Sequence, residues 1–208
     1  MNERAFESKK LIIRSYSEKA EDYAVFVNAH PGFKELREKI TKMLMLSSGA
    51  KVLDLGAGTC HYGLGFLAYG CEVLCLDISK KMVRAARQKD AHVIVGDIEK
   101  LPIKGGCVDA AICVNALRYV DAETLIKEIK RILKPKGKML LVDGDRNRVQ
   151  AARLNRTLGK HELERMLLKK GLIRIYSCDE LKSLLERCGC TVEAAEHFRI
   201  YFLLRASV

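Results

Sequence analysis

Residues 52–60 read Val-Leu-Asp-Leu-Gly-Ala-Gly-Thr-Cys, and this stretch decides the fold. An apolar run that contains Asp54 leads into a glycine-rich turn, and a helical pattern follows. Glycine has no Cβ, so the backbone can approach a ligand closely and a positive φ costs little. In open α/β sheets, ligands bind beyond the carboxyl ends of the strands. The stretch therefore predicts a parallel strand whose end meets a nucleotide-like ligand at Gly56 and Gly58.

The spacing of the glycines separates two classes of ligand. A dinucleotide fingerprint has the form G-x-G-x-x-G, and its third glycine permits close packing of the helix on the strand. Gly56 and Gly58 fit this pattern, but His61 stands at the third position. A nicotinamide-dependent oxidoreductase is therefore only a remote alternative.

The pattern that remains is hydrophobic-hydrophobic-Asp-Leu-Gly-x-Gly-Thr, and a Leu-Lys-Pro-x-Gly turn occurs at residues 133–137. In both motifs the chain resembles the class I S-adenosylmethionine (SAM) methyltransferases, in particular the small-molecule branch that includes quinone-biosynthesis enzymes. The resemblance is strongest over residues 45–145 and extends to 176–208. It implies a SAM-dependent methyltransferase that releases S-adenosylhomocysteine (SAH), and it says little about the acceptor.

Two further acidic residues follow predicted strands. Asp77 ends the apolar run 72–76, at about the distance where a second-strand acid reaches the ribose hydroxyls in such folds. An ionised carboxylate makes strong hydrogen bonds to a vicinal diol. Asp97 follows the run 92–95, and the resemblance implies that this acid and its neighbour hold the adenine amino edge. The residues predicted to bind the cofactor are Asp54, Gly56, Ala57, Gly58, Asp77, Ile78, Met82, Asp97, Ile98 and Asn115.

The order of the predicted elements indicates a single α/β domain over residues 1–208, which is within the usual size of one domain. We expect a Rossmann-like, seven-stranded, mostly parallel sheet with an antiparallel last strand and helices on both faces. Later strands are predicted at 108–114, 138–142, 191–195 and 198–204, with a helix at 179–188. The predicted parts are an N-terminal helical cap (1–45), a SAM-binding core (46–145), a basic helical insertion (146–175), and a C-terminal helix and strand pair (176–208).

The expected reaction is an in-line displacement, in which a nucleophile of the acceptor attacks the sulfonium methyl group. The cofactor supplies an activated methyl, so the protein mainly positions the partners and excludes water. A general base is needed only if the nucleophile arrives protonated. Tyr16 and Tyr23 match an opening pattern of many small-molecule methyltransferases, and their spacing places them on one helix face. The candidates for catalysis or acceptor contact are His61, Asn115, Arg118, Tyr119, Tyr16, Tyr23, Asp143 and Arg146.

Several of these candidates have two interpretations that the sequence leaves open. His61 either faces the pocket or is an exposed helix residue. Arg118 would suit an anionic acceptor, or it lies on a helix face while Tyr119 packs in the core. The two N-terminal tyrosines either touch the methionine moiety or the acceptor, or simply pack their helix onto the sheet.

The chain contains 8 cysteines, and one of them departs from the family pattern. Cys60 stands where these methyltransferases usually have a third glycine. We favour a small, soft residue that replaces glycine with minor backbone adjustment over a thiol placed beside the transferred methyl. Reduced and mostly buried cysteines in a cytosolic protein explain the set better than a disulfide framework or a zinc site, and no bound metal is expected.

The net charge is +11, and basic residues concentrate in the segment 146–175. Apolar residues recur there at helical spacing, which predicts a helix with one buried and one basic face. The basic face is either simply solvated or a surface for phosphates, acidic substrates or RNA. The segment lacks aromatic residues for base stacking, which weakens the case for single-stranded nucleic acid.

Three functions follow, of which we favour methyl transfer to a small-molecule acceptor, possibly anionic. The alternatives are a tRNA or rRNA methyltransferase that docks RNA on the basic insertion, and a SAM-binding module without catalysis. Residues 115–118 read Asn-Ala-Leu-Arg and lack the proline-containing clamp of amino-methylating DNA enzymes, and Cys113 lacks the context of a cytosine-attacking nucleophile. No stretch is apolar and long enough to span a bilayer and no secretory signal is recognisable, so we expect a cytoplasmic protein with no membrane partner.

Overall fold

The computed structural model describes residues 3–86, 92–149 and 162–208 of the chain. Three helices precede the sheet: α1 (Glu3–Glu18), α2 (Ala20–Ala29) and α3 (Pro31–Leu44). The core then alternates strands and helices: β1 (Lys51–Leu55), α4 (Leu64–Leu67), β2 (Glu72–Asp77), α5 (Lys80–Ala86), β3 (His92–Val95), β4 (Val108–Val114), the 3-10 turn η1 (Leu117–Tyr119), α6 (Ala122–Ile132) and β5 (Leu133–Gly144). The last described elements are α8 (Glu162–Lys169), α9 (Cys178–Arg187), β6 (Thr191–Phe198) and β7 (Tyr201–Ser207).

The strands form one seven-stranded sheet in the order β3-β2-β1-β4-β5-β7-β6. The first five strands pair in parallel, and β7 is antiparallel to both of its neighbours. Strand order therefore reverses between β1 and β4, which is where an open α/β sheet binds its ligand. The predicted fold class is confirmed, including the antiparallel last strand.

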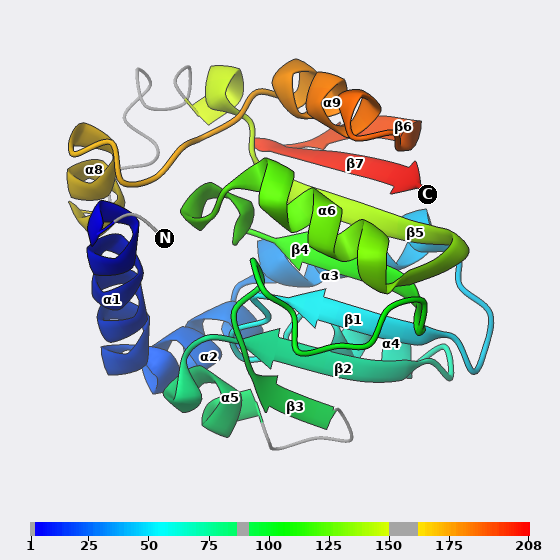
Figure 1. Ribbon diagram of the computed structural model, residues 1–208. Coiled ribbons are helices and arrows are strands. Elements are labelled where there is room, and N and C mark those ends of the chain that lie inside the picture. Colours follow the sequence, from blue (N-terminus) through cyan, green and yellow to red (C-terminus); the bar gives the residue numbers. More distant parts are fainter. Residues whose placement is uncertain (1–2, 87–91, 150–161) are drawn as a thin grey trace.

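Alternate residues of the strands supply two cores, one on each face of the sheet. Leu53 and Leu55 of β1 pack in a cluster with residues of α6 and α9, whereas Val52 packs in a second cluster with residues of α3. This alternation follows from the two-residue period of a strand. The helices of both faces hold the sheet rigid, and in Figure 1 α1 stands beyond the end toward which the arrows of β1 and β2 point.

Two helices that pack in the core on one face of the sheet, α6 and α9, begin with side-chain caps. Asp121 accepts a hydrogen bond from the backbone N–H of Thr124 at 2.8 Å at the start of α6. Ser177 and Glu180 form a capping box at the start of α9. Such caps satisfy N–H groups that have no partner within the helix, so the helices begin at defined residues.

Some predicted boundaries were wrong. Strand β5 begins at Leu133 rather than at 138, because residues of the Leu-Lys-Pro-x-Gly turn already pair with β4 across an irregularity in register. Strand β7 begins at Tyr201 rather than at 198, because β6 continues to Phe198 and Arg199 turns the chain with a φ of 55°.

The N-terminal cap contains a break that the spacing of its tyrosines does not reveal. We expected Tyr16 and Tyr23 on one helix, but α1 ends at Glu18 and α2 begins at Ala20. The rings nevertheless meet edge to face, with centroids 6.2 Å apart. A change of direction at Lys19, rather than one helix face, brings the two rings together.

The basic insertion is described only in part. Arg153, Arg156 and Lys160 lie outside the described residues. Leu167 of α8 is buried and packs with Ile12 of α1 and with Ile173. Among the helices that are described, none is both apolar and long enough to cross a membrane.

Candidate functional site

A cavity lies at the carboxyl ends of β1, β2 and β4, and its empty space, including open solvent at the mouth, is about 850 Å³. Helices α1 and α2 contribute to its wall opposite the sheet. Residues that the sequence predicted for the site and that line it are Gly56, Gly58, Asp77, Ile78, Met82, Asp97, Ile98, Asn115, Tyr16, Tyr23 and Tyr119. Residues that sequence reasoning missed are Lys9, Ile12, Ile13, Ser79, Val114, Ala116 and Val120.

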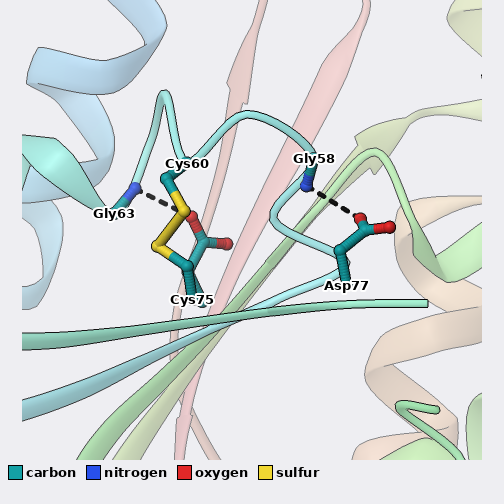
Figure 2. Close-up of a disulfide and its surroundings, with 6 residues drawn as sticks. Gly58, Cys60, Gly63, Cys75 and Asp77 are labelled. Carbon is teal, nitrogen blue, oxygen red and sulfur yellow. Dashed lines mark hydrogen bonds between the residues drawn. A yellow bond between two sulfur atoms is a disulfide. The ribbon is translucent and has the colours of Figure 1, made fainter. Parts of the chain in front are cut away.

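The glycine loop after β1 is held close to the neighbouring strands. Gly56 has a φ of 64°, and a Cβ placed on it would lie 2.5 Å from Cβ of Ala116. The backbone N–H of Ala57 donates to the carbonyl of Leu76 at 3.0 Å, and that of Gly58 donates to Asp77 at 2.8 Å (Figure 2). Only glycine at position 56 therefore combines this backbone conformation with this contact.

Asp77 orders the loop as well as facing the cavity. Its Oδ2 accepts from Gly58, and its Oδ1 accepts from the backbone N–H of Ser79 at 2.8 Å. Burial raises the pKa of the Asp77 carboxyl, and the hydrogen bonds from the backbone oppose that shift. Ser79 in turn accepts from the N–H of Met82, so the turn between β2 and α5 is fixed on both sides.

Asp54 lies beneath the loop rather than in the cavity wall. Its side chain is buried and accepts a hydrogen bond from the N–H of Gly63 at 2.8 Å. Burial raises the pKa of this carboxyl to about 7, because few groups compensate its charge there. The position indicates a role in holding the far end of the loop.

This raised pKa makes a prediction for Asp54→Asn. Between the pKa of the unfolded chain, about 4, and that of the folded protein, about 7, the folded protein holds a proton that the unfolded chain releases, so stability falls as the pH rises through this window. An asparagine stays neutral and still accepts from Gly63. We expect the free energy of unfolding of the variant, relative to wild type, to increase by on the order of 4 kcal/mol across this range. Denaturant unfolding at several pH values measures the difference, and parallel pH curves would contradict it.

Cys60 and Cys75 form a disulfide, and this corrects the expectation that all cysteines are reduced. The two residues are 15 apart in sequence, and their Cα atoms lie 6.0 Å apart because the glycine loop folds back over β2 (Figure 2). Cys60 thus points toward β2 and does not line the cavity. The other cysteines are free: Cys71, Cys113, Cys178 and Cys190 are buried, and Cys107 and Cys188 are half-buried.

The acid after β3 is paired with a residue of the first helix. Lys9 Nζ donates to Asp97 Oδ2 at 2.6 Å and also pairs with Glu99. Burial alone would lower the pKa of Lys9, but the two carboxylates outweigh it and the pKa is raised. A charged lysine therefore lies at the same end of the cavity as Asp97, and no local pattern in the sequence links the two residues.

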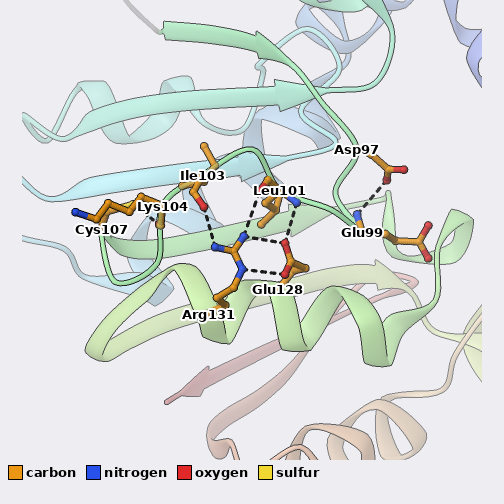
Figure 3. A network of polar contacts seen from close by, with 8 residues as sticks. All are labelled: Asp97, Glu99, Leu101, Ile103, Lys104, Cys107, Glu128 and Arg131. Atoms are coloured by element: carbon orange, nitrogen blue, oxygen red, sulfur yellow. Dashed lines mark hydrogen bonds and ion pairs between the residues drawn. The ribbon is translucent and has the colours of Figure 1, made fainter.

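The loop that carries Asp97 is anchored by helix α6. Glu128 accepts from the backbone N–H of Leu101 at 2.8 Å (Figure 3). Arg131 donates to the carbonyls of Leu101 and Ile103 at 3.1 and 2.8 Å, and it also pairs with Glu128. Side chains of a helix thus satisfy the backbone of a segment that has no strand beside it.

Aromatic rings gather at the opposite end of the cavity. The hydroxyls of Tyr16 and Tyr119 are 2.7 Å apart, and the ring of Tyr23 lies edge to face with that of Tyr16. A Cβ added to Gly58 would lie 3.7 Å from Cε1 of Tyr23, so this ring sits against the glycine loop. Burial raises the pKa of Tyr23, which keeps its hydroxyl neutral at physiological pH.

Asn115 and Arg118 belong to a second polar group at the end of β4. Asn115 has a φ of 59°, which is uncommon for a residue with a side chain. Its backbone N–H donates to the carbonyl of Val142 at 2.9 Å and helps to fix this conformation. Arg118 pairs with Asp143, which also accepts from the N–H of Gly144 at 2.7 Å. The guanidinium is mostly buried and does not line the cavity, so its charge is met inside the protein.

The remaining candidates lie apart from the cavity. His61 is buried, and its Nδ1 is 3.3 Å from Oδ1 of Asn28. Arg146 pairs with Glu180 at 2.9 Å. Ala57 is also outside the cavity wall, and its backbone N–H donates to the carbonyl of Leu76 in β2.

Comparisons with known proteins point to a methyltransferase domain. Residues 53–141 match the family model described as a methyltransferase domain. The chain is 34% identical over 103 residues to a malonyl-[acyl-carrier protein] O-methyltransferase of Pectobacterium atrosepticum, covering 48% of this chain and 41% of that protein. It is 32% identical over 108 residues to a demethylmenaquinone methyltransferase of Corynebacterium glutamicum, covering 51% and 47%. The chain thus spans about half the length of the curated relatives that it matches.

A solved structure extends the likeness over the whole fold. Magnesium protoporphyrin IX methyltransferase from Synechocystis PCC 6803, solved with bound SAH, superposes with a TM-score of 0.76 at 16% identity, covering 96% of this chain and 99% of that one. Residues 53–141 therefore match a methyltransferase domain, and the chain has the fold of the class I SAM-dependent methyltransferases. The cofactor of this class is S-adenosylmethionine.

Proposed function

We propose that the protein transfers the methyl group of SAM to a small-molecule acceptor. The observation that carries the proposal is the cavity at the β1–β4 switch point, where the loop that requires glycine at position 56 lies against the half-buried carboxylate of Asp77. When bound, SAM supplies a methyl group that is already activated by the sulfonium. The chemistry left to the chain is therefore binding, orientation and exclusion of water.

The residues present fit such a cofactor. Asp77 would accept hydrogen bonds from the ribose hydroxyls, since a carboxylate held by backbone donors keeps its oxygens oriented. Ile78 and Met82 would pack against the adenine, and Asp97 with Ile98 would bind its amino edge. Asn115 and the glycine loop would hold the methionine part.

The aromatic end of the cavity favours an acceptor that is uncharged near its reacting atom. Tyr16, Tyr23 and Tyr119 offer rings and hydroxyls to this end of the cavity, and Arg118, which does not line the cavity, is paired with Asp143. Because the described residues at this end of the cavity are tyrosines, Asn115 and apolar groups, we infer that the acceptor nucleophile arrives uncharged and needs no general base. Because Arg118 is paired with Asp143, it no longer supports the hypothesis of an anionic acceptor.

Transfer of labelled methyl from SAM into a cell extract tests the proposal, with the extract then split into small-molecule, RNA and protein fractions. We expect label in the small-molecule fraction, and much less of it when Asp77→Ala replaces wild type at a SAM concentration that does not saturate the variant. Label in RNA that is lost at high salt would instead favour the alternative that the net charge of +11 suggests, with the basic insertion as docking surface. Absence of label despite measured SAH binding would favour a module without catalysis.

A further inference from the structure

We propose that the Cys60–Cys75 bridge is a redox modification site that sets the affinity of the cofactor cavity, with a dithiol reductant as its reaction partner. The inference rests on the proposed function in one respect, that the cavity binds SAM and SAH. It assigns to Cys60 a role that the family pattern, with glycine at this position, does not contain.

The bridge joins two elements that both face the cofactor. Cys60 belongs to the loop that carries Gly56 and Gly58, and Cys75 lies in β2, two residues before Asp77 (Figure 2). Both cysteines are 1% exposed. A change at the bridge therefore acts directly on the distance between the glycine loop and the strand that ends in the ribose-binding acid.

The backbone of Cys60 explains why the bridge affects the loop. Cys60 has a φ of 59°, in the left-handed region that is unfavourable for a residue with a Cβ. Its amide donates to the carbonyl of Ala57 at 2.8 Å, and its carbonyl accepts from Leu64 at 3.1 Å. The bridge holds Cys60 in this conformation, whereas a reduced Cys60 is free to relax to a negative φ.

Reduction should change the loop without unfolding the protein. The hydrogen bonds from Ala57 to Leu76 and from Gly58 to Asp77 do not involve sulfur, so the first half of the loop stays attached to β2. The half from Cys60 to Gly63 loses its covalent attachment and retains the bond to Asp54. Binding of the cofactor then has to restore the ordered loop, which lowers the affinity.

The chemical step is thiol–disulfide exchange. A thiolate of the reductant attacks one sulfur, the S–S bond breaks, and a mixed disulfide forms. The second thiol of the reductant then closes its own disulfide, so Cys60 and Cys75 each gain one electron and one proton and the dithiol loses two of each. Since both sulfurs are buried, attack requires the loop to open, and a cofactor lying against the loop should slow the reaction.

Calorimetric binding of SAH to oxidised and to dithiothreitol-reduced protein tests the proposal. We expect reduction to raise the dissociation constant about tenfold, in line with the strain stored by one residue in a disfavoured conformation. Saturating SAH should slow reduction, measured by trapping the thiols with an alkylating reagent. Cys71→Ala, which removes a buried free cysteine at the other end of β2, should respond to dithiothreitol as wild type does.

Two variants separate the bridge from the backbone conformation that it enforces. Cys75→Ala removes the bridge but leaves a side chain at position 60, so it should bind SAH weakly with or without dithiothreitol. Cys60→Gly removes the bridge and also the conformational penalty, so its affinity should not respond to dithiothreitol and should exceed that of Cys75→Ala. A merely structural cysteine pair would give two variants with equal affinity.

Equal SAH affinity of the oxidised and reduced wild type overturns the proposal. So does peptide mapping under non-reducing conditions, if it finds both cysteines as free thiols after treatment with oxidised glutathione. Failure of the protein to bind SAH in either state contradicts the proposed function itself, and the peptide map then still reports on the bridge.

Discussion

Replacing Gly56 by alanine is expected to weaken SAH binding at least about tenfold and to lower the free energy of unfolding by several kcal/mol, roughly. Two costs add at this position. The φ of 64° is unfavourable for any residue with a Cβ, by about 1–2 kcal/mol. The new Cβ would also lie 2.5 Å from Cβ of Ala116, and overpacking of this kind costs about 1–3 kcal/mol. Calorimetry with SAH and thermal unfolding measure the two effects.

The chain offers a matched control for the cost that the positive φ adds to the Gly56→Ala substitution. Gly106 has a φ of 62°, and a Cβ added there meets nothing within 4 Å. Gly106→Ala should therefore be destabilised only by the unfavourable φ and should keep its affinity for SAH. The double variant Gly56→Ala/Ala116→Gly should recover part of the affinity, because it removes the contact between the two Cβ atoms. If Gly56→Ala and Gly106→Ala behave alike, the close approach to Ala116 is not what position 56 requires.

Replacing Asp77 by alanine should weaken SAH binding by about 1.5–3 kcal/mol, which corresponds to roughly 10- to 150-fold. The change removes the proposed ribose acceptor and leaves the amides of Gly58 and Ser79 without their partner. Asp77→Asn retains one acceptor oxygen and should lose less. Titration of SAH into both variants gives the comparison.

Asp109 provides the control for a general loss of negative charge. It lies near the start of β4, where it pairs with Lys134 at 2.8 Å and accepts from the amide of Lys51 at 2.9 Å. Asp109→Ala removes one carboxylate from the amino-terminal end of the sheet, far along the strand from the cavity. Unchanged SAH affinity is expected for this variant, and unchanged affinity of Asp77→Ala would rule out the role given to Asp77.

The sequence predicted those features that local spacing encodes. A strand that ends in Asp-Leu-Gly-x-Gly specifies both the parallel sheet and the position of the loop, and an acid directly after the next strand meets the same edge of the sheet. This is why the cavity contains Gly56, Gly58 and Asp77 as expected. The antiparallel last strand was expected as part of the fold that the resemblance to methyltransferases implies, whereas the strand order came from the structure.

The features that were missed depend on contacts between distant segments. Lys9 reaches Asp97 only because α1 docks beyond the sheet, and no sequence pattern near Lys9 predicts an acidic partner. Cys60 and Cys75 meet only after the loop has folded over β2. Asp54, His61 and Arg118 are polar residues in or next to cofactor motifs, yet each turns away from the cavity to a partner inside the protein, which periodicity cannot distinguish.

The anchoring of the loop after β3 bears on how this chain can change. Glu128 and Arg131 bind main-chain atoms of Leu101 and Ile103, not their side chains. The course of that loop therefore depends on two residues of α6 that lie outside the cavity wall, in addition to the buried side chain of Leu101. Helix α1 reaches both ends of the cavity, through Lys9 and Tyr16, whereas α6 supports only the end that contains Asp97. A substitution of Glu128 or Arg131 can therefore alter the proposed recognition of the adenine without any change in the cavity wall.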